Sequence, residues 1–337
     1  MRNAITRLLG MISIGTTALA VAACGGGSGT TSTATVRAAQ PPELSSITVA
    51  AVPVADDAGL YVAKDRGLFA QAGLNVTIDP IVSSAVATAG MNSGKYAVTA
   101  GNSVSYIQDQ VGHAANLEIV ADGSLMRPGN QALYTAPSST IANVSGLQGK
   151  RIGVNVLNNI GTLLIDSVLQ SNGVPLNSVH FVAIPAGFPG MADALQHGQI
   201  DAAWLPEPWG SMDEVSDGLT ELADLDQGAN SNFPIAWYVA TKAWAKKYPR
   251  TLAAFLGALK QGQRMAGSNR VLVEQAMENL PAPYTVPSSI ASVMSLETYP
   301  VNVAPDIDLS AVQQVADLMY QVSMLKKQFR VSAMLSH

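Results

Sequence analysis

Hydrophobic and polar positions follow two rhythms between residues 47 and 241. Short apolar or alternating runs are typical of strands, and the stretches between them carry the 3.6-residue period of helices. The predicted strands are Ile47–Val52, Leu74–Asp79, Tyr96–Ala100, Leu117–Ala121, Leu133–Thr135, Arg151–Asn155, His180–Ile184, Asp201–Leu205 and Ile235–Thr241. The predicted helices between them cover 58–66, 84–92, 104–111, 160–172 and 190–196. Repeated strand–helix–strand units predict an α/β fold with parallel sheets flanked by helices.

The last third of the chain has a different pattern. Leu252, Phe255, Leu256 and Leu259 form one helical apolar stripe, and residues 315–322 carry a second. Prolines separate the helices between the two stripes. The sequence therefore predicts a C-terminal helical block that packs on the α/β body.

The N-terminal segment predicts export. Arg2 and Arg7 precede an uncharged, apolar or small run, Leu8–Ala23, which is the layout of a secretory signal and shorter than the roughly 17–25 residues of a membrane span. "VAAC", ending at Cys24, resembles the lipobox of bacterial lipoproteins. This resemblance implies that residues 1–23 are removed and that Cys24 is lipidated; the alternative is an ordinary cleaved signal. Residues 24–44 have the Gly/Ser/Thr composition of a flexible tether.

Composition narrows the possible functions. The 337-residue chain carries a net charge of −5 and no basic run, so no nucleic-acid partner is expected. A single cysteine excludes an internal disulfide. None of the four histidines has metal-site spacing, and no nucleophile elbow or phosphate loop is present. We therefore expect no enzymatic activity, no metal and no cofactor.

Three segments resemble a known family. They are "YVAKDRGLFAQAGLNVTI" (61–78), "LQGKRIGVNVLNNIGTLLIDSVLQSNGV" (147–174) and "ADALQHGQIDAAWLPEPW" (192–209). They are similar to segments of ABC-transporter solute-binding proteins of the nitrate/sulfonate/taurine and pyrimidine-precursor type. The resemblance implies the type II periplasmic-binding-protein fold, with two α/β lobes, a ligand cleft and two crossover segments. Lobe 1 would comprise 45–135 plus 236–337 and lobe 2 would comprise 136–235, with crossovers near 134–137 and 233–237.

The resemblance also implies a function. A monomer anchored to the outer face of the bacterial cytoplasmic membrane, or periplasmic, would capture a small organic solute. It would deliver this solute to an ABC permease with a cytoplasmic ATPase. The alternative is a sensing or partner-presenting surface lipoprotein. A third possibility is an enzyme of the same fold, but the relative that makes the thiamine pyrimidine uses a clustered-cysteine segment, whereas this chain has one cysteine.

Candidate ligand contacts lie where predicted strands end, because ligands of α/β sheets bind outside the carboxyl ends of strands. They share polar, small or aromatic character, and they are Pro53, Asp56, Asp57, Gly101, Asn102, Ser103, Asn155, Asn158, Gly161, Thr162, Phe188, Glu207 and Trp209.

Each candidate has a structural alternative. The aspartates and Asn102 could cap helices, Glu207 could favour a helix dipole, and the aromatic residues could be core, as is expected for Trp204. The backbone of Gly161 and Thr162 could bind an anion at a helix N-terminus. The candidate loops contain acids but no Lys or Arg, which favours a neutral or cationic nitrogen heterocycle; the sulfonate branch of the family favours an anion.

Overall fold

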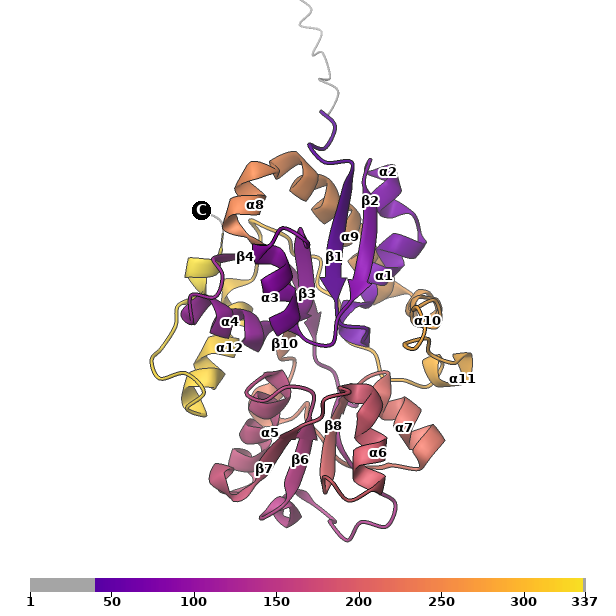
Figure 1. Cartoon of the computed structure of the whole chain (residues 1–337), viewed down its shortest axis with the longest axis vertical. Helices are drawn as coiled ribbons and strands as arrows, with labels where there is room; N and C mark the ends of the chain where they lie inside the picture. Colours follow the sequence, from indigo (N-terminus) through magenta and orange to yellow (C-terminus); the bar gives the residue numbers. More distant parts are fainter. Residues whose placement is uncertain (1–39, 336–337) are drawn as a thin grey trace, which may run out of the picture. The chain divides into compact units, whose positions relative to one another are not determined.

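Two five-stranded mixed sheets organise the part of the chain that the computed structural model describes, residues 40–335 (Figure 1). Sheet A has the order β2-β1-β3-β10-β4, with bounds β1 Ser46–Ala51, β2 Asn75–Pro80, β3 Val98–Asn102, β4 Leu117–Leu125 and β10 Pro234–Thr241. In this sheet β1 is parallel to β2 and β3, whereas β10 is antiparallel to both of its neighbours. These apolar strands are covered on both faces, which is why they contain nearly continuous hydrophobic runs.

Sheet B has the order β7-β6-β8-β5-β9. Its strands are β5 Gln131–Thr135, β6 Arg151–Val154, β7 His180–Ala183, β8 Ala202–Pro206 and β9 Thr220–Asp224. Here β5 is the antiparallel member, paired with β8 and β9. Two mixed sheets flanked by helices confirm the predicted α/β class and the type II periplasmic-binding-protein fold.

Helices cover both sheets (Figure 1). Those associated with sheet A are α1 Ala58–Asp65, α2 Leu68–Gln71, α3 Ser84–Asn92, α4 Ser103–Val111, α8 Lys242–Lys247, α9 Pro249–Ser268, α10 Arg270–Glu278, α11 Ser288–Ala291 and α12 Leu309–Gln321. Those of sheet B are α5 Ile160–Ser171, α6 Met191–Gln196 and α7 Trp209–Asp217. The predicted C-terminal apolar stripe of α9 is buried, and Phe255 stacks on Phe69 of α2 with ring centroids 5.3 Å apart. In residues 40–335 no helix is both long and apolar enough to cross a bilayer.

The chain passes between the sheets earlier than expected. β4 leads into β5 through residues 126–130, and β9 leads into β10 through residues 225–233. Tyr134, expected at a crossover, lies inside the fully buried strand β5, and Trp237 lies inside β10. An apolar run predicts a strand but does not show which sheet the strand joins, so the first boundary could not be placed from the pattern. The predicted division at residue 135 assigns β5 to lobe 1, whereas β5 pairs in sheet B.

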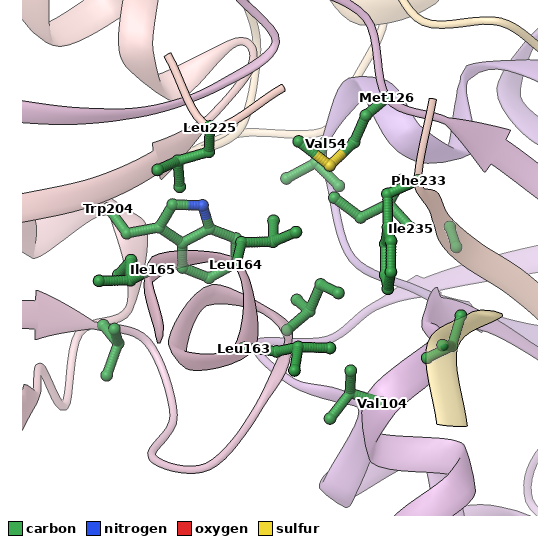
Figure 2. Close-up of a cluster of buried hydrophobic side chains, with 14 of the residues drawn as sticks. Val54, Val104, Met126, Leu163, Leu164, Ile165, Trp204, Leu225, Phe233 and Ile235 are labelled. Atoms are coloured by element: carbon green, nitrogen blue, oxygen red, sulfur yellow. The ribbon is translucent and has the colours of Figure 1, made fainter. Parts of the chain in front are cut away.

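One apolar cluster continues from sheet A to sheet B beside these crossovers (Figure 2). Val104 of α4 lies against the start of α5, where Leu163 and Leu164 are fully buried. Met126 and Phe233, one from each crossover, belong to the same cluster. Burial of these side chains stabilises the arrangement in which the two sheets lie close together.

Candidate ligand-binding site

Two small cavities lie where loops of both sheets meet. The first, of about 30 Å³, is lined by Val52, Val54, Asp56, Asp57, Ser83, Gly101, Asn102, Asn155, Asn159, Ile160, Phe188, Trp204 and Pro206. The second, of about 20 Å³, is lined by Val52, Pro53, Ile81, Val82, Ala186, Gly187, Phe188, Pro189, Trp209 and Tyr284. Val52 and Phe188 contact both cavities. We refer to the two together as the intersheet site.

The structure brings together eight of the thirteen predicted site residues. Asp56, Asp57, Gly101, Asn102, Asn155 and Phe188 line the first cavity, and Pro53, Trp209 and again Phe188 line the second. Ser103, Asn158, Gly161, Thr162 and Glu207 line neither. Whether any of these residues contacts a ligand stays a prediction. Ser83, Asn159, Ile160, Trp204 and Tyr284 line the site without having been proposed from the sequence.

Asp57 is the polar side chain of the site that local structure explains least. It lies at the N-cap position of α1 but makes no capping hydrogen bond, so the alternative role as a helix cap does not apply. The residue is fully buried, and neither carboxylate oxygen makes a hydrogen bond of standard geometry within residues 40–335; the Val52 backbone makes only a weak contact with it. Burial and the neighbouring Asp56 raise the pKa of Asp57 well above its usual range, against a smaller opposing effect of the Val52 backbone. Relative to an exposed aspartate, burial therefore favours the neutral, protonated form of the Asp57 carboxyl group.

Two tyrosines surround Asp57 from within sheet A and its helices. Burial raises the pKa of Tyr61 and of Tyr238, and the charge of Asp57 raises both further. Neither tyrosine hydroxyl makes a hydrogen bond of standard geometry among the described residues. The two carboxylate oxygens and the two hydroxyl groups are thus four neighbouring buried polar atoms without well-formed hydrogen bonds, which is uncommon because unpaired buried polar groups are unfavourable.

Asp56, in contrast, belongs to a connected hydrogen-bond network. Gln131 Nε2 donates to Asp56 Oδ1 at 3.2 Å, and Trp204 Nε1 donates to Gln131 Oε1 at 3.1 Å. Asp56 also shares a hydrogen bond with Glu297, which accepts from Asn130 Nδ2 at 2.6 Å. Burial raises the pKa of Asp56, and burial and the charge of Asp56 raise that of Glu297, so the two carboxyl groups share a proton. This network joins β5 and β8 of sheet B to the loop after β1.

Aromatic rings form the wall of the site that sheet B contributes. Phe188 meets Trp204 edge to face, with ring centroids 5.3 Å apart. Trp204 was expected to be a packing residue, and it both packs and lines the site. Its ring lines the first cavity, and it also lies against the start of α5, where a Cβ on Gly161 would clash with it. Trp209 meets Tyr284 at 6.5 Å, and its indole N–H has no partner within the described residues.

The remaining predicted residues have structural roles. Asn102 Oδ1 caps α4 by accepting from Ser105 N at 2.9 Å while still lining the cavity. Thr162 Oγ1 accepts from Asn159 N at 2.8 Å at the start of α5. Ser103 is fully buried away from the cavities. Gly161 and Thr162 follow Asn159 and Ile160, which line the first cavity, and the Trp204 ring packs against Gly161.

Two predicted residues hold the sheets together instead. Glu207 Oε1 accepts from Ser211 Oγ at 2.7 Å and from Ser295 N at 3.2 Å, and its carbonyl accepts from Ala55 N at 2.9 Å. At the rim of the site, Gln108 Nε2 of α4 donates to the carbonyl of Asn158 at 2.7 Å. Glu207 therefore bridges the sheets beside the crossovers, and Asn158 bridges them at the solvent-exposed edge.

The described lining of the two cavities contains acidic side chains and no basic ones. Across residues 40–335, no Lys or Arg lines either cavity, whereas Asp56 and Asp57 line the first. No group of three or more His, Cys, Asp or Glu side chains in the described part of the chain could hold a metal ion. The site offers two buried carboxyl groups, asparagine amides, the indole N–H of Trp209, which is unpaired within the described residues, and aromatic faces. Cys24, the predicted lipidation site, lies outside the described residues.

Comparison with known proteins agrees with this fold. Residues 55–269, well over half of the chain, match a family model described as NMT1/THI5 like. The 4-amino-5-hydroxymethyl-2-methylpyrimidine phosphate synthase of Uromyces fabae is 26% identical over 215 residues. That match covers 60% of this chain and 61% of the synthase, so the chain spans about three fifths of the length of this relative.

Solved structures share the fold at low identity. The alkanesulfonate-binding protein SsuA from Xanthomonas axonopodis pv. citri, bound to MOPS, aligns with a TM-score of 0.71 and 17% identity over 87% of this chain and 99% of that one. The periplasmic nitrate-binding protein NrtA from Synechocystis PCC 6803 aligns with a TM-score of 0.70 and 14% identity, covering 85% and 84% of the two chains. At these identities the likeness establishes the architecture.

Proposed function

The chain belongs to the NMT1/THI5-like family, and on this premise we propose that it is the solute-binding component of an ABC import system. Its ligand would be a small nitrogen heterocycle held between sheets A and B. The observation that carries this proposal is Asp57, a fully buried carboxyl group without a hydrogen-bond partner in residues 40–335, at the wall of the intersheet site.

The ligand class follows from what the site lacks and offers. A carboxylate accepts hydrogen bonds, so Asp57 requires N–H or O–H donors, and a ring N–H beside an amino group would supply two. A cationic ring would favour the ionised form of Asp57, because a neighbouring opposite charge lowers the pKa of a buried acid. Phe188, Trp204 and Trp209 provide aromatic surfaces for a flat ring.

An anion fits the same residues poorly. Binding of a sulfonate or nitrate calls for donors, and the cavities that the structure describes contain no Lys or Arg. At the N-terminus of α5, where an anion could bind, Asn159 and Ile160 line the first cavity, but the Trp204 ring packs against Gly161. The names of the solved relatives include anion binders, but they share only the fold with this chain.

Capture requires the sheets to separate. A cavity of about 30 Å³ has room for a few water molecules, because one water occupies roughly 10–15 Å³ on this measure, and drug-sized ligands need about 300 Å³ or more. Rotation about residues 126–130 and 225–233 would open the site and break the Gln108–Asn158 contact at its edge. Closure around a ligand would then restore these contacts and desolvate the Asp57 carboxyl group.

The cellular setting remains part of the proposal. Export by the predicted signal peptide, lipidation of Cys24 and delivery of the solute to a permease with a cytoplasmic ATPase are supported by the sequence pattern and by the resemblance. The two bodies that move would be the predicted lobes, 45–135 plus 236–337 and 136–235, with one change. Strand β5 belongs to sheet B and would move with the second lobe. A single copy contains both walls of the site, which supports a monomer.

A second candidate is enzymatic, because the chain is 26% identical to a pyrimidine phosphate synthase over part of its length. The two functions differ in the fate of the bound molecule. A binding protein returns its ligand chemically unchanged, which mass spectrometry of the ligand recovered after denaturation tests directly. Recovery of a converted product, with wild-type protein only, would favour the enzyme.

Thermal unfolding with a ligand panel tests the binding function. We expect aminopyrimidines and related heterocycles to raise the unfolding midpoint, and alkanesulfonates and nitrate to leave it unchanged. A ligand at about 100 times its dissociation constant adds about 2.7 kcal/mol, equivalent to roughly 5 °C or more for a protein of this size. Stabilisation by anions alone would contradict the ligand class, and the absence of any stabilising solute would remove the support for capture.

A further inference from the structure

The surface formed by α8 and α9 has an unusual distribution of charge. Between residues 227 and 273 the sequence contains no Asp or Glu, although the whole chain has a net charge of −5. The same stretch contains seven cations, which are Lys242, Lys246, Lys247, Arg250, Lys260, Arg264 and Arg270. Positive charge is therefore concentrated on one part of an acidic protein.

The cations on α9 form a continuous stripe. Arg250, Ala253, Gly257, Lys260 and Arg264 follow one another at intervals of three or four residues, which places them on one side of a helix. The opposite side of α9, with Phe255 and Leu259, is buried against sheet A. A Cβ on Gly257 would meet no atom within 4 Å, so no side chain of the described residues covers the exposed side of α9 at this position between the cations.

A shallow apolar groove runs along this stripe. Its volume is about 640 Å³, and it is lined by Glu118, Ala245, Lys246, Pro249, Leu252, Ala253, Leu256, Gly257, Lys260, Val303, Ala304 and Pro305. Lys246 and Lys260 stand at this groove, and neither forms an ion pair within residues 40–335. Glu118 is the one acid in the lining. The groove combines apolar floor and cationic rim.

Aromatic side chains extend the same surface. Trp244 and Tyr248 of the α8 region have ring centroids 5.6 Å apart, and the Lys247 ammonium lies 5.0 Å from the Tyr248 ring centre. Trp and Tyr together with Lys and Arg are enriched where proteins meet the headgroup layer of a membrane. We call Lys246, Lys247, Arg250, Lys260 and Arg264, with Trp244 and Tyr248, the basic face.

The described chain begins at this face. Arg250 Nε donates to the carbonyl of Pro41 at 2.9 Å and pairs with Glu43 Oε1 at 3.6 Å, and Thr251 N donates to Glu43 at 2.7 Å, so residues 41–43 are held against the start of α9. Figure 1 shows α8 and α9 at the end of sheet A where β1 begins, away from sheet B. The described chain therefore begins beside the basic face, at the end of sheet A away from sheet B.

We propose that the basic face docks on a bilayer surface that contains anionic lipids. Charge complementarity favours acidic headgroups, the aromatic pair and the apolar groove suit the interfacial layer, and the described chain begins beside this face. Docking would leave the intersheet site and both crossovers free. The inference does not depend on the identity of the solute.

Vesicle binding tests this surface with a matched control. Full-length protein with Cys24→Ser is mixed with phosphatidylcholine vesicles that contain either no phosphatidylglycerol or about 30% of it. Two further variants of this protein are compared, one with Lys246→Glu/Lys260→Glu and one with Lys326→Glu/Lys327→Glu. The second pair makes the same charge change at exposed lysines after α12. We expect the first pair to weaken binding to anionic vesicles by at least about tenfold, since each cation near the surface contributes about 1 kcal/mol. The control pair should change it less than twofold.

A second readout locates the contact. A lipid-soluble quencher should reduce the fluorescence of a dye on Ala253→Cys but not of a dye on Val215→Cys, an exposed position on α7. Equal effects of the two lysine pairs, or equal quenching at both dyes, would overturn the proposal. Binding that ignores lipid charge would also overturn it. Because every variant carries the same N-terminal segment, differences between variants report the folded surface.

Discussion

Replacement of Asp57 by Asn removes the titratable group on which the account of the site depends. Asp57 is fully buried, and its oxygens have no hydrogen-bond partner within the described part of the chain. Burial and the charge of Asp56 raise the pKa of Asp57 well above the value near 3.9 that an aspartate has in an unfolded chain. Asparagine keeps the size of the side chain and has no proton to release.

The magnitude follows from the linkage between proton binding and folding. Below about pH 4 the carboxyl group is protonated in both states and contributes nothing to the pH dependence. Above that pH the unfolded chain releases the proton and the folded chain retains it, so wild-type stability falls by about 1.4 kcal/mol per pH unit from this group until the folded pKa is reached. Asp57→Asn lacks this loss. The variant should therefore gain on wild type by about 1.4 kcal/mol for each pH unit above about 4, until the folded pKa of Asp57 is reached.

Urea unfolding of ligand-free protein at pH 5, 6 and 7 measures this difference. Asp306→Asn, which removes an exposed carboxyl group, is the matched control and should stay parallel to wild type. If the free energies of unfolding of Asp57→Asn and wild type ran parallel, Asp57 would be ionised in the folded protein and the argument for its unsatisfied state would fail.

Four further outcomes follow from the same geometry. Phe188→Leu should weaken heterocycle binding by about 0.5–1.5 kcal/mol in calorimetric titration, because it removes an aromatic surface of the cavity wall against which a bound ring would pack; unchanged affinity would show that Phe188 does not face the ligand. Gln108→Ala should raise the ligand dissociation rate several-fold in stopped-flow measurements, since a hydrogen bond across the rim contributes about 0.5–1.5 kcal/mol to closure. The control Gln328→Ala, at an exposed position, should leave this rate unchanged. Glu43→Gln should lower the thermal unfolding midpoint at pH 7, and the difference from wild type should shrink as the pH falls toward 2. The reason is that hydrogen bonds from Arg250 and Thr251 outweigh burial and lower the pKa of Glu43 from 4.5 to about 2. Equal differences at all pH values would show that the charge of Glu43 does not stabilise the start of α9. A cationic heterocycle should release protons on binding to wild type near pH 6 and not to Asp57→Asn, as shown by heats measured in buffers of different ionisation enthalpy.

Much of the fold could be predicted because its strands are apolar and its helices amphipathic. The predicted strands at 117–121, 151–155, 180–184 and 235–241 overlap β4, β6, β7 and β10. β9, Thr220–Asp224, was missed because its residues are polar or only half-buried, as suits an edge strand. The crossovers were misplaced by several residues, since hydrophobicity does not encode which strand becomes the partner of β5.

The candidate site was harder to predict than the fold. Strand ends indicated the correct loops, and six of the predicted residues converge on the first cavity. Whether a polar residue of a loop caps a helix or faces a cavity depends on side-chain direction, which spacing does not determine: Asn102 does both, and Asp57 does not cap. Trp204 sits in a buried strand, and nothing in its local sequence shows that it reaches across α5 to the site.

The central claim is that a donor-rich ring is bound between the two sheets by Asp57. A crystal structure of the protein with the heterocycle that most raises its unfolding midpoint tests this directly. The account predicts the ring between Phe188 and the loop after β1, with a nitrogen within about 3.2 Å of an Asp57 carboxylate oxygen. A ligand that binds elsewhere, or an intersheet ligand that leaves both Asp57 oxygens without a donor, would contradict it.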